Sequence, residues 1–122
     1  MSVIEKPKTY RRGREHRPPI EIVGDPAREL LWEAANLLER RGWRRGYYVG
    51  DRSEYCKIGA LNMAAGEGPI SLGRNPTKMR ARALLAKTLG VRSKMLTAWN
   101  DKESRTKEEV IDALRRASEA PE

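Results

Sequence analysis

The feature that most constrains the fold is a pair of long segments with apolar residues at helical spacing, each punctuated by proline and glycine. An Asp-Pro pair at 25–26 begins the first and Gly42 ends it; an Asn-Pro pair at 75–76 begins the second and Gly90 ends it. Asp and Asn are favoured N-caps, and proline at the first helical position sacrifices no needed donor. Glycine just past the last turn permits the left-handed backbone that ends many helices. The sequence therefore predicts two long helices.

Three further helices are predicted around these two. One spans about 53–65, where small residues at four-residue spacing allow close packing, and a shorter one spans about 93–100. The last begins at Thr106, which forms a capping box with Glu109 three residues later. The expected architecture is all-α, a compact bundle of about five helices.

The chain of 122 residues has the length of one domain. Residues 1–19 are expected to be a basic N-terminal arm, disordered or loosely docked, and residues 20–119 a single helical domain. Residues 20–23 are expected to lie extended against it. No apolar run approaches the roughly 18 residues of a membrane span. These observations predict a soluble, cytoplasmic protein without a membrane partner.

Charge is distributed unevenly along the chain. Residues 71–95 hold seven lysines and arginines and no acidic residue, within a chain whose formal net charge is +8. A concentrated positive charge favours acidic partners, nucleic acids above all.

The same region has the pattern of a helix-turn-helix at about 76–100. Ala86 is small where the two helices must meet, and Gly90, four residues later, permits the turn. The apolar residues expected to fill the corner are Val91, Leu96 and Trp99.

In this motif the N-terminal half of the second helix carries the residues that read the groove. A row at i, i+4 and i+8 on the preceding helix is expected to follow a phosphate strand, and the basic arm to add further contacts. The predicted nucleic-acid-binding residues are Arg74, Lys78, Arg82, Arg92, Lys94 and Thr97, with Arg11, Arg12 and Arg14 from the arm.

Two alternatives to nucleic-acid binding stay open. A glycine-linked helical corner occurs in many bundles that never contact DNA, and a basic helix face is often only a solvated face. A protein–protein interaction module that binds an acidic host protein is the second functional reading. An enzyme is not expected: Cys56 has no histidine placed to activate it, because His16 lies in the arm. No metal site or cofactor is predicted.

Four short motifs together resemble a known family. They read L-L-E-R-R-G-W at 37–43, Y-C-K-I-G-A-L at 55–61, A-W-N-D at 98–101 and R-T-K-E-E-V at 105–110. Their order is similar to that in a family of small, uncharacterised proteins of actinobacteria and their phages, with C-x-x-G-A, W-N-D and R-T-x-x-E-V motifs. The resemblance spans about residues 27–118. It implies an origin and a helical fold, and it carries no assigned activity. In this reading the W-N-D and R-T residues form a folding corner.

Overall fold

The computed structural model of the chain describes residues 17–44, 56–67 and 75–121. Within these ranges the chain forms five α-helices and two short 3-10 helices, which confirms the all-α prediction. Residues 1–16 of the predicted arm lie outside the described residues. The elements are η2 (Ile20–Ile22), α1 (Pro26–Arg41), α2 (Lys57–Ala64), α3 (Pro76–Leu89), η3 (Ser93–Met95), α4 (Leu96–Asp101) and α5 (Lys107–Glu119).

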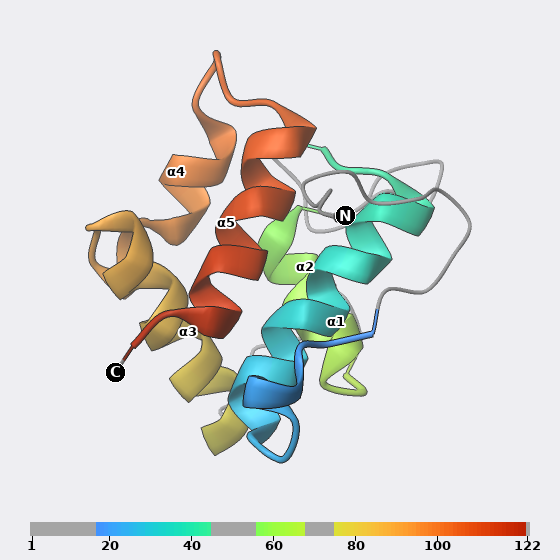
Figure 1. Cartoon of the computed structure of the whole chain (residues 1–122). Helices are drawn as coiled ribbons and strands as arrows, with labels where there is room; N and C mark the ends of the chain where they lie inside the picture. The colour runs from blue at the N-terminus through green and yellow to red at the C-terminus, as the bar shows by residue number, and fades with distance from the viewer. Residues whose placement is uncertain (1–16, 45–55, 68–74, 122) are drawn as a thin grey trace, which may run out of the picture.

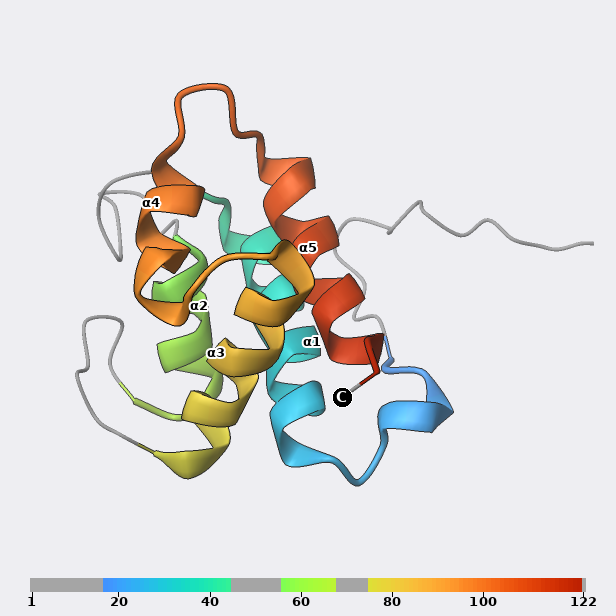
Figure 2. The ribbon, with the colours of Figure 1, turned by 90° about the vertical axis from the view of Figure 1, so that its left-hand side faces the viewer.

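Helices α1 and α5 run in opposite directions through the centre of the molecule and make the most extensive contact between any two elements (Figure 1). Helix α2 packs against α1, and α3 packs against both α1 and α5. The short η3 and α4 follow α3 at one edge of the bundle. Figure 2 shows this edge, with α3 and α4 on the side turned to the viewer.

Several helix ends follow the predicted signals. Asn75 Oδ1 accepts a hydrogen bond of 3.1 Å from the Lys78 backbone amide at the start of α3, and Gly90 ends that helix at φ +71°. At α5, Thr106 Oγ1 accepts from the Glu109 amide at 3.2 Å, and the Glu109 carboxylate accepts from the Thr106 amide at 2.9 Å. The capping box is therefore confirmed.

Asp25 is the N-cap residue of α1, as predicted, but its side chain does not cap the helix. Its carboxylate instead accepts from Arg28 Nε at 3.1 Å and from Arg80 of α3 at 2.6 Å. The hydrogen bond from Arg80, together with the charges of Arg80 and Arg28, lowers the pKa of Asp25 below its usual value against the opposing effect of burial. Asp25 thus joins α1 to α3.

Two local predictions were wrong. Cys56 has an extended backbone and is the N-cap of α2, its Sγ accepting from the Gly59 amide at 3.4 Å, so the helix begins after Cys56 and not near residue 53. Residues 20–23 are not an extended segment either. Residues 20–22 form the 3-10 helix η2, because this turn lets Ile22 pack inward while Ile20 and Val23 face solvent.

The core lies between α1 and α5 and is closed by α2 and α3. Its fully buried apolar side chains include Leu31, Leu38, Leu61, Leu85, Val110 and Leu114. Burying such a side chain contributes roughly 1.5–3 kcal/mol, so these contacts dominate the stability of the fold. In the part of the chain that the structure describes, no helix is both long and apolar enough to cross a membrane.

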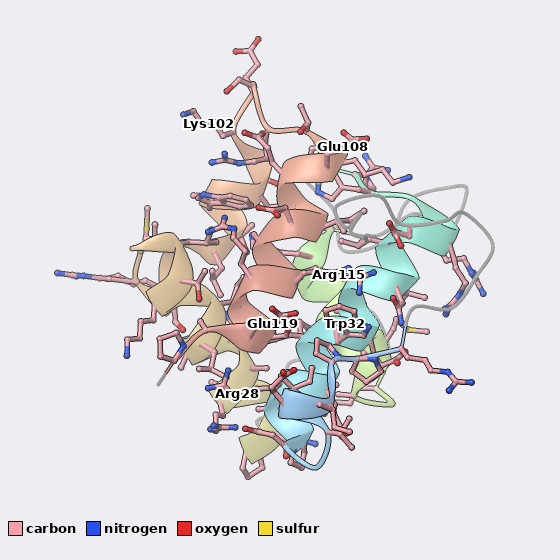
Figure 3. All side chains as sticks on the ribbon, viewed as in Figure 1. Arg28, Trp32, Lys102, Glu108, Arg115 and Glu119 are labelled. Atoms are coloured by element: carbon pink, nitrogen blue, oxygen red, sulfur yellow. The ribbon has the colours of Figure 1, made fainter. Side chains whose placement is uncertain are left out.

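Two arginines connect α1 to α5 through polar contacts. The Arg115 guanidinium lies over the Trp32 ring, 4.1 Å from its centroid, and donates to Asn36 Oδ1 at 2.8 Å (Figure 3). At the other end of the pair, Arg28 donates to the Ser118 carbonyl at 3.0 Å. Because helix C-terminal carbonyls lack intrahelical partners, this contact caps the end of α5.

Candidate functional site

The corner from α3 through Gly90 and η3 to α4 has the turn that the sequence predicts. Gly90 adopts the left-handed conformation, and the Val91 amide donates back to the Ala86 carbonyl at 3.0 Å. Ala86 and Leu96 are buried, and Val91 and Trp99 are partly buried against the core. These contacts fix the direction in which the chain leaves α3.

Three of the predicted binding residues are exposed on this corner. Arg92 precedes η3, Lys94 lies within it, and Thr97 lies in the first turn of α4. Met95 is 46 % exposed beside them, whereas Leu96 anchors the segment in the core. Residues 75–100 contain no Asp or Glu, so no carboxylate of this segment offsets its positive charge.

Lys78 was predicted as a phosphate contact, and this prediction is wrong. Its side chain is 2 % exposed, and its Nζ donates to Glu67 Oε1 at 2.7 Å and to Asn62 Oδ1 at 2.9 Å. The reason is the phase of the helix: Lys78 falls on the same face as buried Ala81 and Leu85. The lysine therefore ties α3 to the end of α2.

The predicted row of phosphate contacts along α3 consequently does not form. Arg82 is partly buried, and its Nε is enclosed without a hydrogen-bond partner among the described residues. Arg80 pairs with Asp25 and its side chain is 40 % exposed, whereas Lys87 is exposed near the end of α3. Four further predicted residues lie outside the described residues: Arg11, Arg12, Arg14 and Arg74.

Asn100, which belongs to the W-N-D motif of the predicted folding corner, is a buried polar centre. Its Oδ1 accepts from Trp43 Nε1 at 2.7 Å and from the Lys57 backbone amide at 3.3 Å. Its Nδ2 donates to the Arg44 carbonyl at 3.3 Å and to Asp101 Oδ1 at 3.0 Å. One side chain thus joins the end of α1, the start of α2 and α4.

Lys57 is the second buried centre, and its position was not anticipated. Its side chain is fully buried, its Nζ donates to the Leu96 carbonyl, and Nζ lies 4.9 Å from the centroid of the Trp99 ring. Burial lowers the pKa of Lys57 to about 7. Nearby Cys56 and Asp101 oppose the shift, and Arg105 and Arg82 add to it. The amine therefore changes charge near neutral pH.

A second basic side chain, that of Arg105, packs on the Trp99 ring. Arg105 lies over this ring at 3.6 Å from the centroid and donates from Nε to the Trp99 carbonyl at 2.9 Å. Arg105 also lies 3.7 Å from the Glu109 carboxylate. Because Arg105 and Lys57 both lie close to the ring, Trp99 acts in the described structure as a packing centre of the corner and not as a free stacking platform.

The short motifs that carry the family resemblance meet at this corner. Lys57 lies in C-K-I-G-A, Trp99 and Asn100 in W-N-D, and Arg105 and Glu109 in R-T-K-E-E-V. Their mutual contacts make them one structural unit, which adds Lys57 to the W-N-D and R-T residues of the predicted folding corner.

The geometry therefore defines a small helical protein with a helix-turn-helix-like corner supported by a buried polar cluster. A model of a family of unknown function, DUF6197, matches residues 23–120, and the chain belongs to this family. No curated protein and no solved structure matches the chain.

Proposed function

We propose that this protein binds nucleic acid, DNA or RNA, through the corner surface made by η3 and the first turn of α4. The observation that carries the proposal is the exposure of Arg92, Lys94 and Thr97 on a short segment that buried Leu96 anchors. Cations and a hydroxyl on a fixed helical corner suit contacts to phosphates and base edges. No enzymatic activity and no cofactor is proposed.

The distribution of charge around the corner supports the same surface. Lys87 is exposed in the last turn of α3, and Lys102 is exposed just after α4, at the tip of the connection to α5 (Figure 3). Acidic residues return only at Asp101 and Glu103, beyond the first turn of α4. An approaching polyanion therefore meets positive charge first along η3.

The alternative proposal is a bacterial or phage interaction module that binds an acidic host protein. Met95 favours it, because this side chain is 46 % exposed next to Lys94, and methionines are frequent at adaptable protein-binding surfaces. The origin in actinobacteria or their phages, implied by the motif resemblance, belongs to this proposal.

The proposal is tested with the double variant Arg92→Glu/Lys94→Glu. Binding to random-sequence duplex DNA and to single-stranded RNA is measured by fluorescence anisotropy, beside the melting temperature. Affinity is expected to fall by about tenfold or more, because two phosphate contacts become repulsive. The melting temperature is expected to change little, because both side chains are exposed.

Arg40→Glu/Arg41→Glu is the matched control, since both residues are exposed near the end of α1 and the net charge changes equally. A smaller loss in this control supports a localised surface. Equal losses in the two variants would mean that binding follows only the total charge. Full affinity in Arg92→Glu/Lys94→Glu would mean that the corner does not contact nucleic acid.

A further inference from the structure

The corner is attached to the rest of the bundle by buried Leu96, by Val91 and Trp99 packed against the core, and by a set of polar contacts. Helix α4 has six residues, and among them Leu96 and Asn100 are buried whereas Thr97 and Ala98 are exposed. Asn100 binds the Lys57 amide and Trp43, and the Lys57 amine binds the Leu96 carbonyl. A short helix held by a few side chains is the kind of element that opens locally before the whole protein unfolds.

The amine of Lys57 is enclosed by groups from every element around it. The Leu96 carbonyl and Trp99 ring come from α4, together with the carboxylate of Asp101. Arg82 of α3 and Arg105 before α5 bring like charge toward the amine, and Cys56 adjoins it on α2. Among the described residues the Asp101 carboxylate thus acts on the amine together with the cations of Arg82 and Arg105, and Glu109 lies 3.7 Å from Arg105.

This arrangement has a thermodynamic consequence. With the corner closed, burial holds the pKa of Lys57 at about 7, whereas a hydrated lysine has a pKa near 10.4. Protons therefore bind more tightly to an opened state in which the amine reaches water. By linkage, lowering the pH from about 10 to about 7 favours opening, and the effect levels off below the closed-state pKa.

We propose that Lys57 makes the η3–α4 corner a pH-responsive element: with the amine neutral the corner stays closed on α2, and protonation favours its opening and hydration of the amine. The effect of this opening on nucleic-acid binding rests on the proposed function. Opening releases Leu96 and with it the fixed placement of Arg92, Lys94 and Thr97. Acidification then weakens binding, against the general tendency of added positive charge to strengthen it.

The test is amide hydrogen exchange of the full chain without nucleic acid, between pH 6 and pH 9, corrected for the intrinsic rate at each pH. The opening equilibrium of the α4 amides is expected to rise by roughly tenfold per pH unit as the pH falls from 9 to 7, and to level off below. The α4 amides are also expected to exchange through smaller openings than the core amides of α1 and α5.

Lys57→Met is the decisive variant because methionine has a similar length, suits a buried site and carries no charge. Its α4 opening is expected to lose this pH dependence. Lys57→Gln, which stays neutral but retains a donor, is expected to do the same. A pH-independent opening in the natural protein, or the same pH dependence in both variants, would overturn the proposal. It would also fail if the α4 amides exchanged only through the same global opening as the core amides.

Affinity for duplex DNA at pH 8 and pH 6.5 separates this inference from the proposed function. Binding that weakens at pH 6.5 in the natural protein but not in Lys57→Met supports both. If no binding occurs at either pH while the exchange data follow the expected slope, the proposed function fails and the pH-responsive corner stands.

Discussion

Trp43 and Asn100 meet across 57 positions of sequence, with the indole Nε1 donating to the amide Oδ1 at 2.7 Å. The bond joins a residue two positions after α1 to the penultimate residue of α4. Asn100 is 1 % exposed, so its amide group forms its hydrogen bonds with the protein and not with bulk water. Asn100 is therefore one of the side chains, with Leu96 and Trp99, that hold the corner against the bundle.

Replacing Asn100 by alanine is expected to lower the free energy of unfolding by about 2–3 kcal/mol. The cause is that the Lys57 amide loses a partner in a buried setting, and the Trp43 Nε1 and the Arg44 carbonyl each lose one in a partly buried setting. Urea unfolding followed by circular dichroism measures the change. Thr97→Ala, on the exposed side of the same helix, serves as control and should stay within about 0.5 kcal/mol of the natural protein.

The buried ion pair between Lys78 and Glu67 gives an asymmetric prediction. Glu67→Ala leaves the buried ammonium of Lys78 hydrogen-bonded to Asn62 but without its carboxylate partner, and should cost about 3 kcal/mol. Lys78→Met should cost less, because Glu67 is partly exposed and its carboxylate can hydrate. Urea unfolding compares the two variants. An equal or larger loss in Lys78→Met would contradict this account of the pair.

A variant of Lys78 also tests whether a buried lysine contributes to nucleic-acid binding. Because its amine is buried, Lys78→Met should leave affinity for nucleic acid within about twofold of the natural protein, a difference of about 0.4 kcal/mol. The anisotropy titration used for the corner variant measures it. A loss of affinity as large as that of Arg92→Glu/Lys94→Glu would mean that Lys78 does contribute to nucleic-acid binding.

The sequence predicted the helices better than it predicted the faces they present. Proline, glycine and capping residues act within a few positions, so the ends of α1, α3 and α5 could be inferred from local patterns. The orientation of α3 depends on which residues α1 and α5 cover, and the apolar stripe of this helix is weak. Lys78 consequently looked like a surface cation although it lies on the buried face.

The turn of the corner could be predicted from the sequence, whereas the buried polar cluster that supports it could not. The turn at Gly90 and the burial of Leu96 follow from a spacing within one segment, so both were predictable. The cluster around Asn100 and Lys57 draws residues from distant segments, and no spacing rule relates position 57 to position 100. Only the grouping of these residues in the resembling motifs hinted that they share a role.

The free energy of unfolding is expected to depend on pH through Lys57. Its pKa is depressed in the folded state, so the unfolded chain binds more protons between about pH 7 and pH 10. Stability should therefore rise with pH across this window, by at most about 1.4 kcal/mol per pH unit. Below the window the destabilisation from Lys57 is constant, so it adds no further pH dependence. Urea unfolding at a series of pH values measures the slope.

Lys57→Met isolates this contribution, because all other titrating groups are shared with the natural protein. The stability of the natural protein relative to Lys57→Met should rise as the pH rises from 7 to 10. A difference that stays constant over this range would show that the Lys57 amine keeps an ordinary pKa in the folded state.

The capping box of α5 predicts a smaller effect. Thr106→Ala removes the acceptor of the Glu109 amide and should lower the free energy of unfolding by about 1 kcal/mol. Thr106→Ser, which keeps the hydroxyl, should restore most of it. Thermal unfolding monitored by circular dichroism distinguishes the two, and equal melting temperatures for both variants would argue against a stabilising cap.

The central claim, that the η3–α4 corner is a nucleic-acid surface, is tested most directly by the salt dependence of binding to random-sequence duplex DNA and single-stranded RNA. The natural protein is expected to give a slope equivalent to about four or more neutralised phosphates. Arg92→Glu/Lys94→Glu should lower that slope by about two. Weak binding that vanishes by physiological salt, with the same slope in both proteins, would contradict the claim and favour the search for an acidic protein partner.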